Sequence, residues 1–502
     1  MIIERDAMMG VSTAFGNTLP ESNTDSVNTS GAFRILVLAD LGGQHFWGNP
    51  VTVDRDNLED VMERMNVRLN VRDDPAPANI EIAFTELEDF HPDRLFERLD
   101  VFESLRTRRQ RLQDDATFAE EAKAILEVQG ATGAATPEVT ETSPEPPPEI
   151  VDPRDLLNAT LEQTQAAQKP ILQQIAEGVL DVDALARRLV EPYVIQKSDP
   201  RKPEFMAAVD DAIAETMRTL LHHPAYQSLE AAWLGIKMLV RRLETDQTLQ
   251  IDILNVSQEQ LRQDVCADDD LTKSKLYKIL VESTGVAGAE PWTAVVGDFA
   301  FDTGSSDVDV LGRVAQIHAA AGTVFIAGAL PGIVGCADLA QTPDPDDWSS
   351  LSQQDAERWK LLRSLPATSN VRLALPRVLA RRPYGQDTDP IDSFQFEEIP
   401  DGTAHSDYLW MNAAFAVTIL LGQSFTRAGW EFMSSWEPTL ENLPMHVYDV
   451  DGESEIKPCG EVELLLRAGH VFAEHGLTAV HSVRGHDSVR IPSLRSLSDT
   501  KG

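Results

Sequence analysis

Cysteine and positive charge are both scarce in this sequence. The 502 residues include three cysteines, Cys266, Cys336 and Cys459, which lie far apart and form no CxxC pair. This spacing argues against a disulfide framework and a thiolate metal site, and it is typical of a reducing compartment. Lysine and arginine number 43 against 81 aspartate and glutamate residues, a formal net charge of −38. Such a charge repels nucleic acid and anionic lipid unless the basic residues gather on one face.

Long apolar runs and targeting signals are missing as well. The most apolar stretch, LWMNAAFAVTILLG at 409–422, is shorter than the ~20 residues of a membrane-spanning helix and predicts a buried helix. The N-terminus MIIERDAMMGVSTAFG has acidic residues and no sustained apolar core, unlike a secretory signal. The basic cluster RTRRQRL at 106–112 is interpreted as a solvated helix face. We therefore expect a soluble cytoplasmic protein that binds no nucleic acid and enters no membrane.

The first ordered unit is predicted at residues 33–128, after a mobile N-terminal arm at 1–32 that is rich in Ser, Thr, Asn and Gly. FRILVLADLGG begins it with a buried-strand pattern that ends in an Asp and two glycines. A strand is predicted at 80–87, and the helix after it has Pro92 near its first turn. The helix predicted between these strands has apolar residues three or four apart, namely Leu58, Val61, Met62, Met65 and Leu69.

A linker at 129–154, rich in Pro, Thr and Glu, separates this unit from a larger one. An N-terminal helical segment at 155–203 is expected to come next, and a large unit at 204–499 follows it. Helical periodicity dominates to residue 243, and strands then alternate with helices. The predicted fold class is mixed α/β (α+β): a small α/β domain joined by the linker to a larger mixed α/β domain.

Two adjacent histidines, His222 and His223, stand between two amphipathic helices in the larger unit. Pro224 suits the first turn of the second helix, and a histidine in the last turn of the first helix complements the helix dipole. Adjacent side chains point in different directions, and no HxxxH or HExxH motif lies nearby. The pair is therefore interpreted as helix capping and not as a metal site.

Catalytic motifs are absent. The sequence contains no GxGxxG, GxxxxGK[ST] or GxSxG motif, and no catalytic, cofactor-binding or metal-ligating residue is assigned. A metal-dependent enzyme that uses the C-terminal histidines stays open as a minor hypothesis, although no cysteine or helical i, i+4 pair accompanies them. These histidines are His470, His475, His481 and His486. Trp233 and Trp410 are predicted in the core, and Arg377, Arg381 or Arg382 are predicted to pair with Glu397 or Glu398.

Taken together, the ordered segments resemble the contractile sheath of type VI secretion systems, and they do so twice. Residues 33–127 resemble the small subunit (TssB, also called VipA) through FRILVLADLGG, VDRDNLEDVMERMNVRLNV and IEIAFTELEDFHPDRL. Residues 155–497 resemble the large subunit (TssC, or VipB) through HHPAYQSLEAAWLGIKMLV, IDILNVSQEQLRQDV, AEPWTAVVGDFAFD, LALPRVLARRPYG, FQFEE and LWMNAAFAVTILLGQSFTRAGW. The linker thus joins two subunits that are usually separate chains.

The resemblance implies a structural protein without catalysis. Paired small and large subunits would polymerise with other sheath subunits around an inner tube of Hcp rings, on a baseplate, and sheath contraction would drive effector delivery. The segment DLLNATLEQTQ at 155–165 also resembles the large-subunit helix that the ClpV unfoldase grips, with Leu156, Leu157, Leu161, Gln163 and Thr164 as the matching residues. A plain amphipathic helix at a domain edge has the same apolar pattern.

One departure from the family concerns the C-terminus. Large sheath subunits usually continue beyond the stretch that corresponds to DSVRIPSLRSLSD at 487–499, with a further domain that holds the inner tube. This departure motivates an alternative function, an accessory or regulatory module, such as a cap or adaptor, that binds sheath subunits and does not polymerise by itself.

Overall fold

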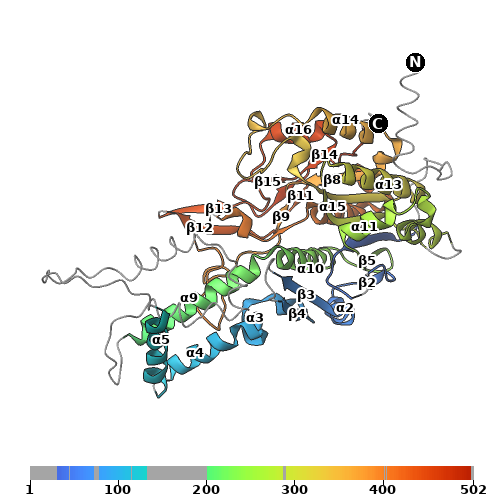
Figure 1. Ribbon diagram of the computed structural model, residues 1–502. Coiled ribbons are helices and arrows are strands. Elements are labelled where there is room, and N and C mark those ends of the chain that lie inside the picture. Colours follow the sequence, from blue (N-terminus) through green and yellow to red (C-terminus); the bar gives the residue numbers. More distant parts are fainter. Residues whose placement is uncertain are drawn as a thin grey trace.

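The computed structural model describes residues 31–132 and 201–498, except 45, 73–78, 115, 286–289, 401, 403 and 451. A seven-stranded sheet in the order β14-β8-β7-β6-β1-β5-β2 lies at its centre (Figure 1). Its neighbouring strands are parallel except for β2, which runs antiparallel to β5. The strands are β1 (Phe33–Ala39), β2 (Val51–Val53), β5 (Leu249–Asn255), β6 (Ala294–Phe301), β7 (Val324–Ala329), β8 (Val371–Leu375) and β14 (Leu477–Ala479).

Both faces of the sheet are covered, which explains why β1 is apolar along most of its length. Side chains alternate between the two faces of a strand. Ile35 and Val37 accordingly lie in one hydrophobic core, and Leu36 and Leu38 lie in the other. The buried strand predicted from FRILVLA is confirmed.

Helices form the outer two layers. The first core includes α10 (Pro224–Arg242) and α15 (Ala413–Ala428), and the second includes α11 (Gln258–Cys266), α13 (Ser305–Ala321), α14 (Gln353–Arg363) and α16 (Leu466–Glu474). A Cβ atom at Gly235 of α10 would lie 2.5 Å from the ring of Phe415 in α15, so glycine lets these two helices approach closely. The buried helix predicted near 409–422 is confirmed as α15, although it begins only after Asn412 caps it. No helix among the described residues is long and apolar enough to cross a membrane.

The remaining N-terminal elements pack below the sheet in Figure 1. They are α2 (Leu58–Met65), β3 (Val67–Arg72), β4 (Asn79–Phe84), α3 (Pro92–Arg98), α4 (Glu103–Gln113) and α5 (Phe118–Thr132), and they are joined there by α9 (Lys202–Leu221). The predicted strand near 80–87 is present as β4, and Pro92 occupies the first turn of α3 as predicted.

The predicted helix through Leu69 is wrong in its last turn. Asn66 adopts a left-handed conformation at φ 51° and ends α2, and Leu69 lies in β3. Val67, Leu69 and Val71 alternate with polar residues, which is a strand pattern. Leu69 also lies four residues after Met65, so it fitted the helical spacing as well.

The remaining strands are short and lie in the C-terminal part of the chain. They are β9 (Val378–Leu379), β10 (Trp410–Met411), β11 (Thr439–Leu440), β12 (His446–Val450), β13 (Glu453–Lys457), β15 (His481–Ser482) and β16 (Val489–Arg490). The single turn α12 (Lys275–Tyr277) lies between α11 and α13 in the sequence. The mixed α/β class predicted from the sequence is confirmed.

The central sheet crosses the predicted domain boundaries. Strand β1 comes from the predicted unit at 33–128, whereas its neighbours β5 and β6 come from the unit at 204–499. The predicted arm at 1–32 lies almost wholly outside the described residues, as do most of the linker at 129–154 and most of the helical segment at 155–203. The boundaries themselves stay a prediction.

Candidate functional site: the seam

The two segments of the chain meet along an extensive seam, which we define as the contacts between residues 31–132 and residues 201–498. Its first part is the pairing of β1 with β5 on one side, from Phe33↔Leu249 to Ala39↔Asn255, and with β6 on the other. Parallel strands of this kind are buried and bonded along both edges. The N-terminal segment therefore supplies an interior strand of the sheet.

Charged side chains reinforce this pairing at the start of β1. The Arg34 guanidinium lies 3.0 Å from the Asp252 carboxylate on β5 and stacks 3.8 Å from the centre of the Trp292 ring. The hydroxyl of Thr52 on β2 donates to the same carboxylate at 2.7 Å. Asp252 thus joins three strands of the sheet through its side chain.

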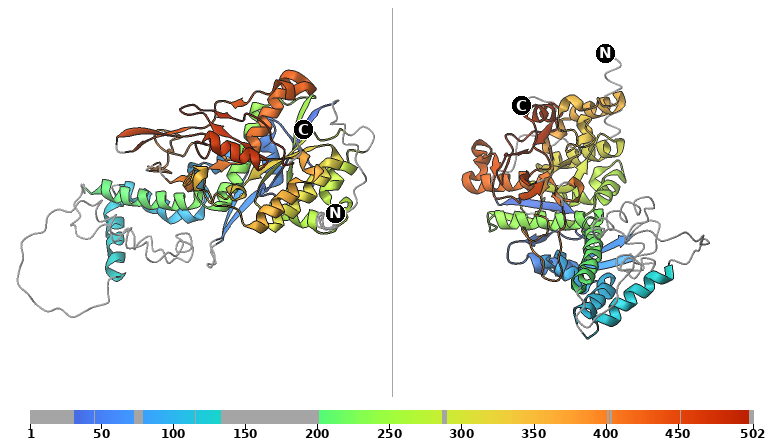
Figure 2. Two further views of the ribbon diagram at one scale, coloured as in Figure 1. Left: turned by 90° about the horizontal axis from the view of Figure 1, so that it is seen from above. Right: turned by 90° about the vertical axis from the view of Figure 1, so that its left-hand side faces the viewer.

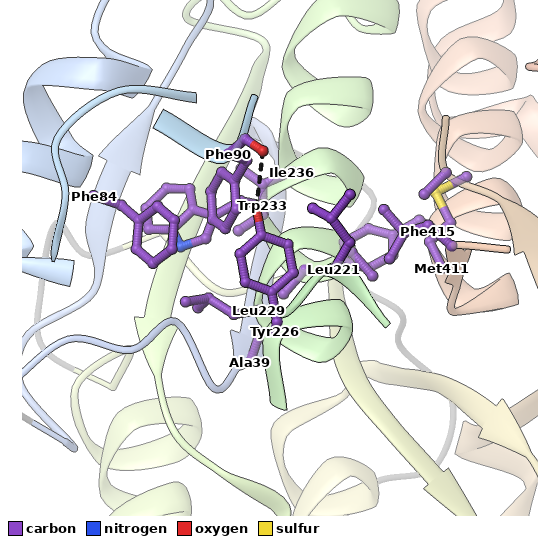
Figure 3. Packing of buried hydrophobic residues seen from close by; sticks show 14 of the residues in the cluster. Ala39, Phe84, Phe90, Leu221, Tyr226, Leu229, Trp233, Ile236, Met411 and Phe415 are labelled. Atoms are coloured by element: carbon purple, nitrogen blue, oxygen red, sulfur yellow. Dashed lines mark hydrogen bonds between the residues drawn. The ribbon is translucent and has the colours of Figure 1, made fainter. Parts of the chain in front are cut away.

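The second part of the seam is an apolar contact between α10 and the N-terminal segment (Figure 3). Phe84 and Phe90 stack with ring centroids 4.1 Å apart, and Tyr226 packs edge-on against Phe90 at 5.8 Å. The Tyr226 hydroxyl donates to the Phe90 carbonyl at 2.8 Å, and the Trp233 indole N–H donates to the Leu41 carbonyl at 3.3 Å. Burial raises the pKa of Tyr226 well above its ordinary value, so the hydroxyl stays a donor. Both aromatic rings combine apolar packing with a satisfied polar atom.

The two histidines at the start of α10 have separate structural roles. The Nδ1 atom of His223 accepts the Ala225 N–H at 3.2 Å and caps α10, while His222 is the C-cap residue of α9. The capping interpretation is therefore confirmed. The helix-dipole argument did not predict two carboxylate contacts of the His222 ring, which lies 3.8 Å from a Glu398 oxygen and 3.5 Å from an Asp407 oxygen. Burial lowers the pKa of His222, although both carboxylates oppose that shift.

A buried ionic cluster lies beside these histidines. Arg381 reaches Glu230 of α10 at 2.6 Å and Glu398 at 2.7 Å, and its guanidinium stacks 4.1 Å from the centre of the Tyr384 ring. Burial alone would lower the pKa of Arg381, but the two carboxylates outweigh it and raise the pKa well above the ordinary value. The His91 ring packs edge-on against Tyr384 at 5.0 Å, which brings the cluster into contact with the N-terminal segment.

The predicted arginine pairs are partly right. Arg381 pairs with Glu398 as predicted, but it also pairs with Glu230, which is far away in sequence. Arg377 pairs instead with Glu461, with 3.1 Å between the Arg377 Nε and a carboxylate oxygen. Charge alone gave no signal for partners so distant in the chain.

Helices α3, α4 and α9 form the third part of the seam. The Asp93 carboxylate accepts the backbone N–H groups of Asp392 and Ser393, at 3.1 and 2.9 Å. Arg109 of α4 lies 2.6 Å from Asp210 of α9. The interpretation of 106–112 as a solvated face is incomplete, because the arginines on it mostly bind partners within the chain. Arg108 and Arg111 both reach the buried Glu121 at 3.2 Å.

The other candidate residues are not brought together. Trp233 and Trp410 are buried as predicted. The four C-terminal histidines are spread over α16, its C-terminus, β15 and the turn after β15, and no group of three or more potential metal ligands occurs in the described ranges. The candidate unfoldase-binding residues Leu156, Leu157, Leu161, Gln163 and Thr164 lie outside the described residues.

Comparison with known proteins finds a match for each of the two segments that form the seam. Residues 203–498 match the family model of VipB (EvpB), the tail sheath N-terminal domain, and residues 21–127 match the model of type VI secretion system VipA. The type VI secretion system sheath protein TssC1 of Pseudomonas aeruginosa PAO1 is 31% identical over 342 residues, which cover 66% of this chain and 68% of that protein. Neither comparison favours the accessory module. The chain thus belongs to the type VI secretion sheath family as a structural sheath component, a fusion of a VipA (TssB) segment with a VipB (TssC) segment.

Proposed function

We propose that one copy of this chain is a small subunit and a large subunit paired one to one, a fused protomer that assembles with other sheath subunits around an inner tube. The observation that carries this proposal is the position of β1, since the VipA segment supplies an interior strand to a sheet whose other strands, except β2, belong to the VipB segment. Fusion fixes their stoichiometry at one to one and gives each segment a high effective concentration of its partner.

The proposed partners are other sheath subunits, Hcp rings and the baseplate, and the proposed location is the bacterial cytoplasm. The role is mechanical and not catalytic: assembly stores energy in one packing of subunits, and contraction releases it by repacking them. We propose no metal or cofactor. Metal analysis of the purified protein should find no stoichiometric ion, and a bound ion at one per chain would contradict this part.

Electron microscopy of the purified protein tests the assembly. We expect tubes or stacked rings in negative stain, either with the protein alone or after addition of the inner-tube protein of the same system. Discrete monomers under both conditions would contradict a polymerising protomer. Small complexes with a separate sheath chain, and no tubes or rings, would favour the accessory module over the polymerising protomer.

The segment 155–165 is a proposed site for the ClpV unfoldase. A fluorescent peptide of this sequence should bind the purified unfoldase. Leu157→Ala with Leu161→Ala should abolish binding, because these side chains form the apolar stripe of the segment. A peptide with Asn158→Ala and Glu162→Ala is the matched control and should still bind. Equal binding by both variants would exclude this site.

A further inference from the structure

Aromatic side chains gather where α15 ends and β1 begins. Helix α15 packs across β6, β7 and β8 on one face of the sheet (Figures 1 and 2), and the short 3-10 helix η9 (Gly429–Ser435) follows it directly. Trp430 and Phe432 of η9 pack against the ring of Phe33 on β1, with ring centroids 6.1 and 5.7 Å away. Phe425, in the last turn of α15, lies 4.7 Å from the same ring. The start of β1 is therefore in direct contact with η9.

The outer side of η9 is apolar and open to solvent. Met433 is 56% exposed, and its neighbours Trp430, Phe432 and Trp436 are each half-buried. Residues three apart lie above one another in a 3-10 helix, so Met433 lies beside Trp430 on one face, and Trp436 comes three residues later, at the end of the helix. We call these four residues the η9 patch. Large apolar side chains that gather on a surface in this way are typical of a binding site.

The described part of the chain begins beside this patch. Residues 1–30 lie outside the described residues. Only Gly31 and Ala32 separate residue 30 from Phe33, whose ring contacts η9. The three steps along the chain from residue 30 to Phe33 span at most about 11 Å. The preceding segment is therefore tethered next to the η9 patch.

An apolar stretch of this preceding segment has the chemistry that suits the patch. Residues 8–19, MMGVSTAFGNTL, contain two methionines, a phenylalanine and a leucine, and none of them is charged. Methionine thioethers make favourable contacts with aromatic rings, and an uncharged stretch is not repelled by the exposed Glu431 of η9. Residues 20–30 form a mostly polar spacer that reaches at most about 40 Å. A tether of this length gives a local concentration on the order of millimolar.

We propose that residues 8–19 dock onto the η9 patch of the same chain. The VipA family model begins at residue 21, so this stretch lies outside the part of the chain that the family match covers. The sequence predicted a mobile arm at 1–32, and the proposal anchors the apolar part of that arm. Docking would shield the η9 patch from other proteins in a chain that has not assembled. The inference goes beyond the proposed assembly and is tested on unassembled protein.

A photoreactive amino acid in place of Met433 tests the contact in the full chain, at a concentration too low for assembly. We expect a cross-link to residues 8–19. In an equal mixture of isotopically labelled and unlabelled chains, a cross-link within one copy never joins a labelled peptide to an unlabelled one. Leu466 is the matched control, because it is 77% exposed on α16, which packs on the other face of the sheet, and it should not cross-link to this stretch. Mixed pairs would assign the patch to a second copy, and cross-links elsewhere, or none, would also overturn the proposal.

Loss of the apolar side chains should uncover the patch. Met8→Ser with Phe15→Ser should raise the fluorescence of the apolar dye ANS at least about twofold, because the dye then binds the exposed aromatic surface. Thr24→Ser with Asn28→Ser changes the spacer instead and should leave the fluorescence at the wild-type level. Thermal melting checks that each variant is folded, and all four positions lie outside the described core. Unchanged dye binding by the folded variant Met8→Ser with Phe15→Ser would overturn the proposal.

Discussion

The hydroxyl of Tyr226 donates a hydrogen bond to the carbonyl oxygen of Phe90 at 2.8 Å, and both groups are buried between the VipA and VipB segments. The two residues are 136 positions apart in the chain. The contact therefore reports directly on whether the two segments are folded together.

Removing this hydroxyl should weaken the whole fold. Tyr226→Phe keeps the ring but leaves the Phe90 carbonyl without a partner, which costs about 1–3 kcal/mol for a buried acceptor. Urea denaturation followed by tryptophan fluorescence should show a lower midpoint with an unchanged slope. Tyr448→Phe removes an exposed hydroxyl and should have a smaller effect. An unchanged midpoint for Tyr226→Phe would mean that this bond contributes nothing.

The buried ionic cluster should be sensitive to the loss of its one arginine. Arg381→Met leaves Glu230 and Glu398 buried close together without their cation, and breaking a buried pair in this way costs about 3–5 kcal/mol. Addition of Glu230→Gln and Glu398→Gln should recover part of the loss, because no uncompensated charge then stays buried. Arg262→Met breaks an exposed pair with Glu259 and should leave the unfolding midpoint almost unchanged. A triple variant no more stable than Arg381→Met would contradict this account.

The close packing of α10 against α15 at Gly235 should leave no room for a side chain at this position. A Cβ atom there would lie 2.5 Å from the fully buried ring of Phe415. Gly235→Ala gains about 1 kcal/mol of helix propensity but should lose about 1–3 kcal/mol to overpacking, so we expect net destabilisation. Gly304→Ala, where the added atom meets no neighbour, is the control for the same substitution. Differential scanning calorimetry of both variants checks the sign, and stabilisation by Gly235→Ala would contradict the packing argument.

Asp298 should make stability fall as pH rises. Burial raises the pKa of Asp298 to about 7, so the folded protein keeps a proton that the unfolded chain releases near 3.8. The folded state binds more protons between these two values, and its stability therefore declines from about pH 4 to about pH 7. Asp298→Asn should flatten that part of the pH profile and raise the urea midpoint at pH 8 relative to wild type. A profile with the same slope in both proteins would show that Asp298 does not titrate there.

The sequence predicted which segments are buried strands or helices, but it did not predict which distant segments they contact. Alternation and apolar runs predicted the buried strand at 33–39 and the buried helix α15, because both signals report on burial alone. The same patterns carried no information on pairing partners, so nothing predicted that β1 lies between β5 and β6. His222 illustrates the same limit: its capping position could be predicted from Pro224, whereas the carboxylates of Glu398 and Asp407 come from segments far along the chain.

The position of β1 also bears on how the protein carries load. A pull on the chain at Phe33, directed along the strand, stretches backbone hydrogen bonds to β5 and β6 at the same time. Bonds loaded together in shear must break as a group, whereas a strand at the edge of a sheet can be peeled off one bond after another. The fused chain thus places a joint that is loaded in shear where its two segments meet.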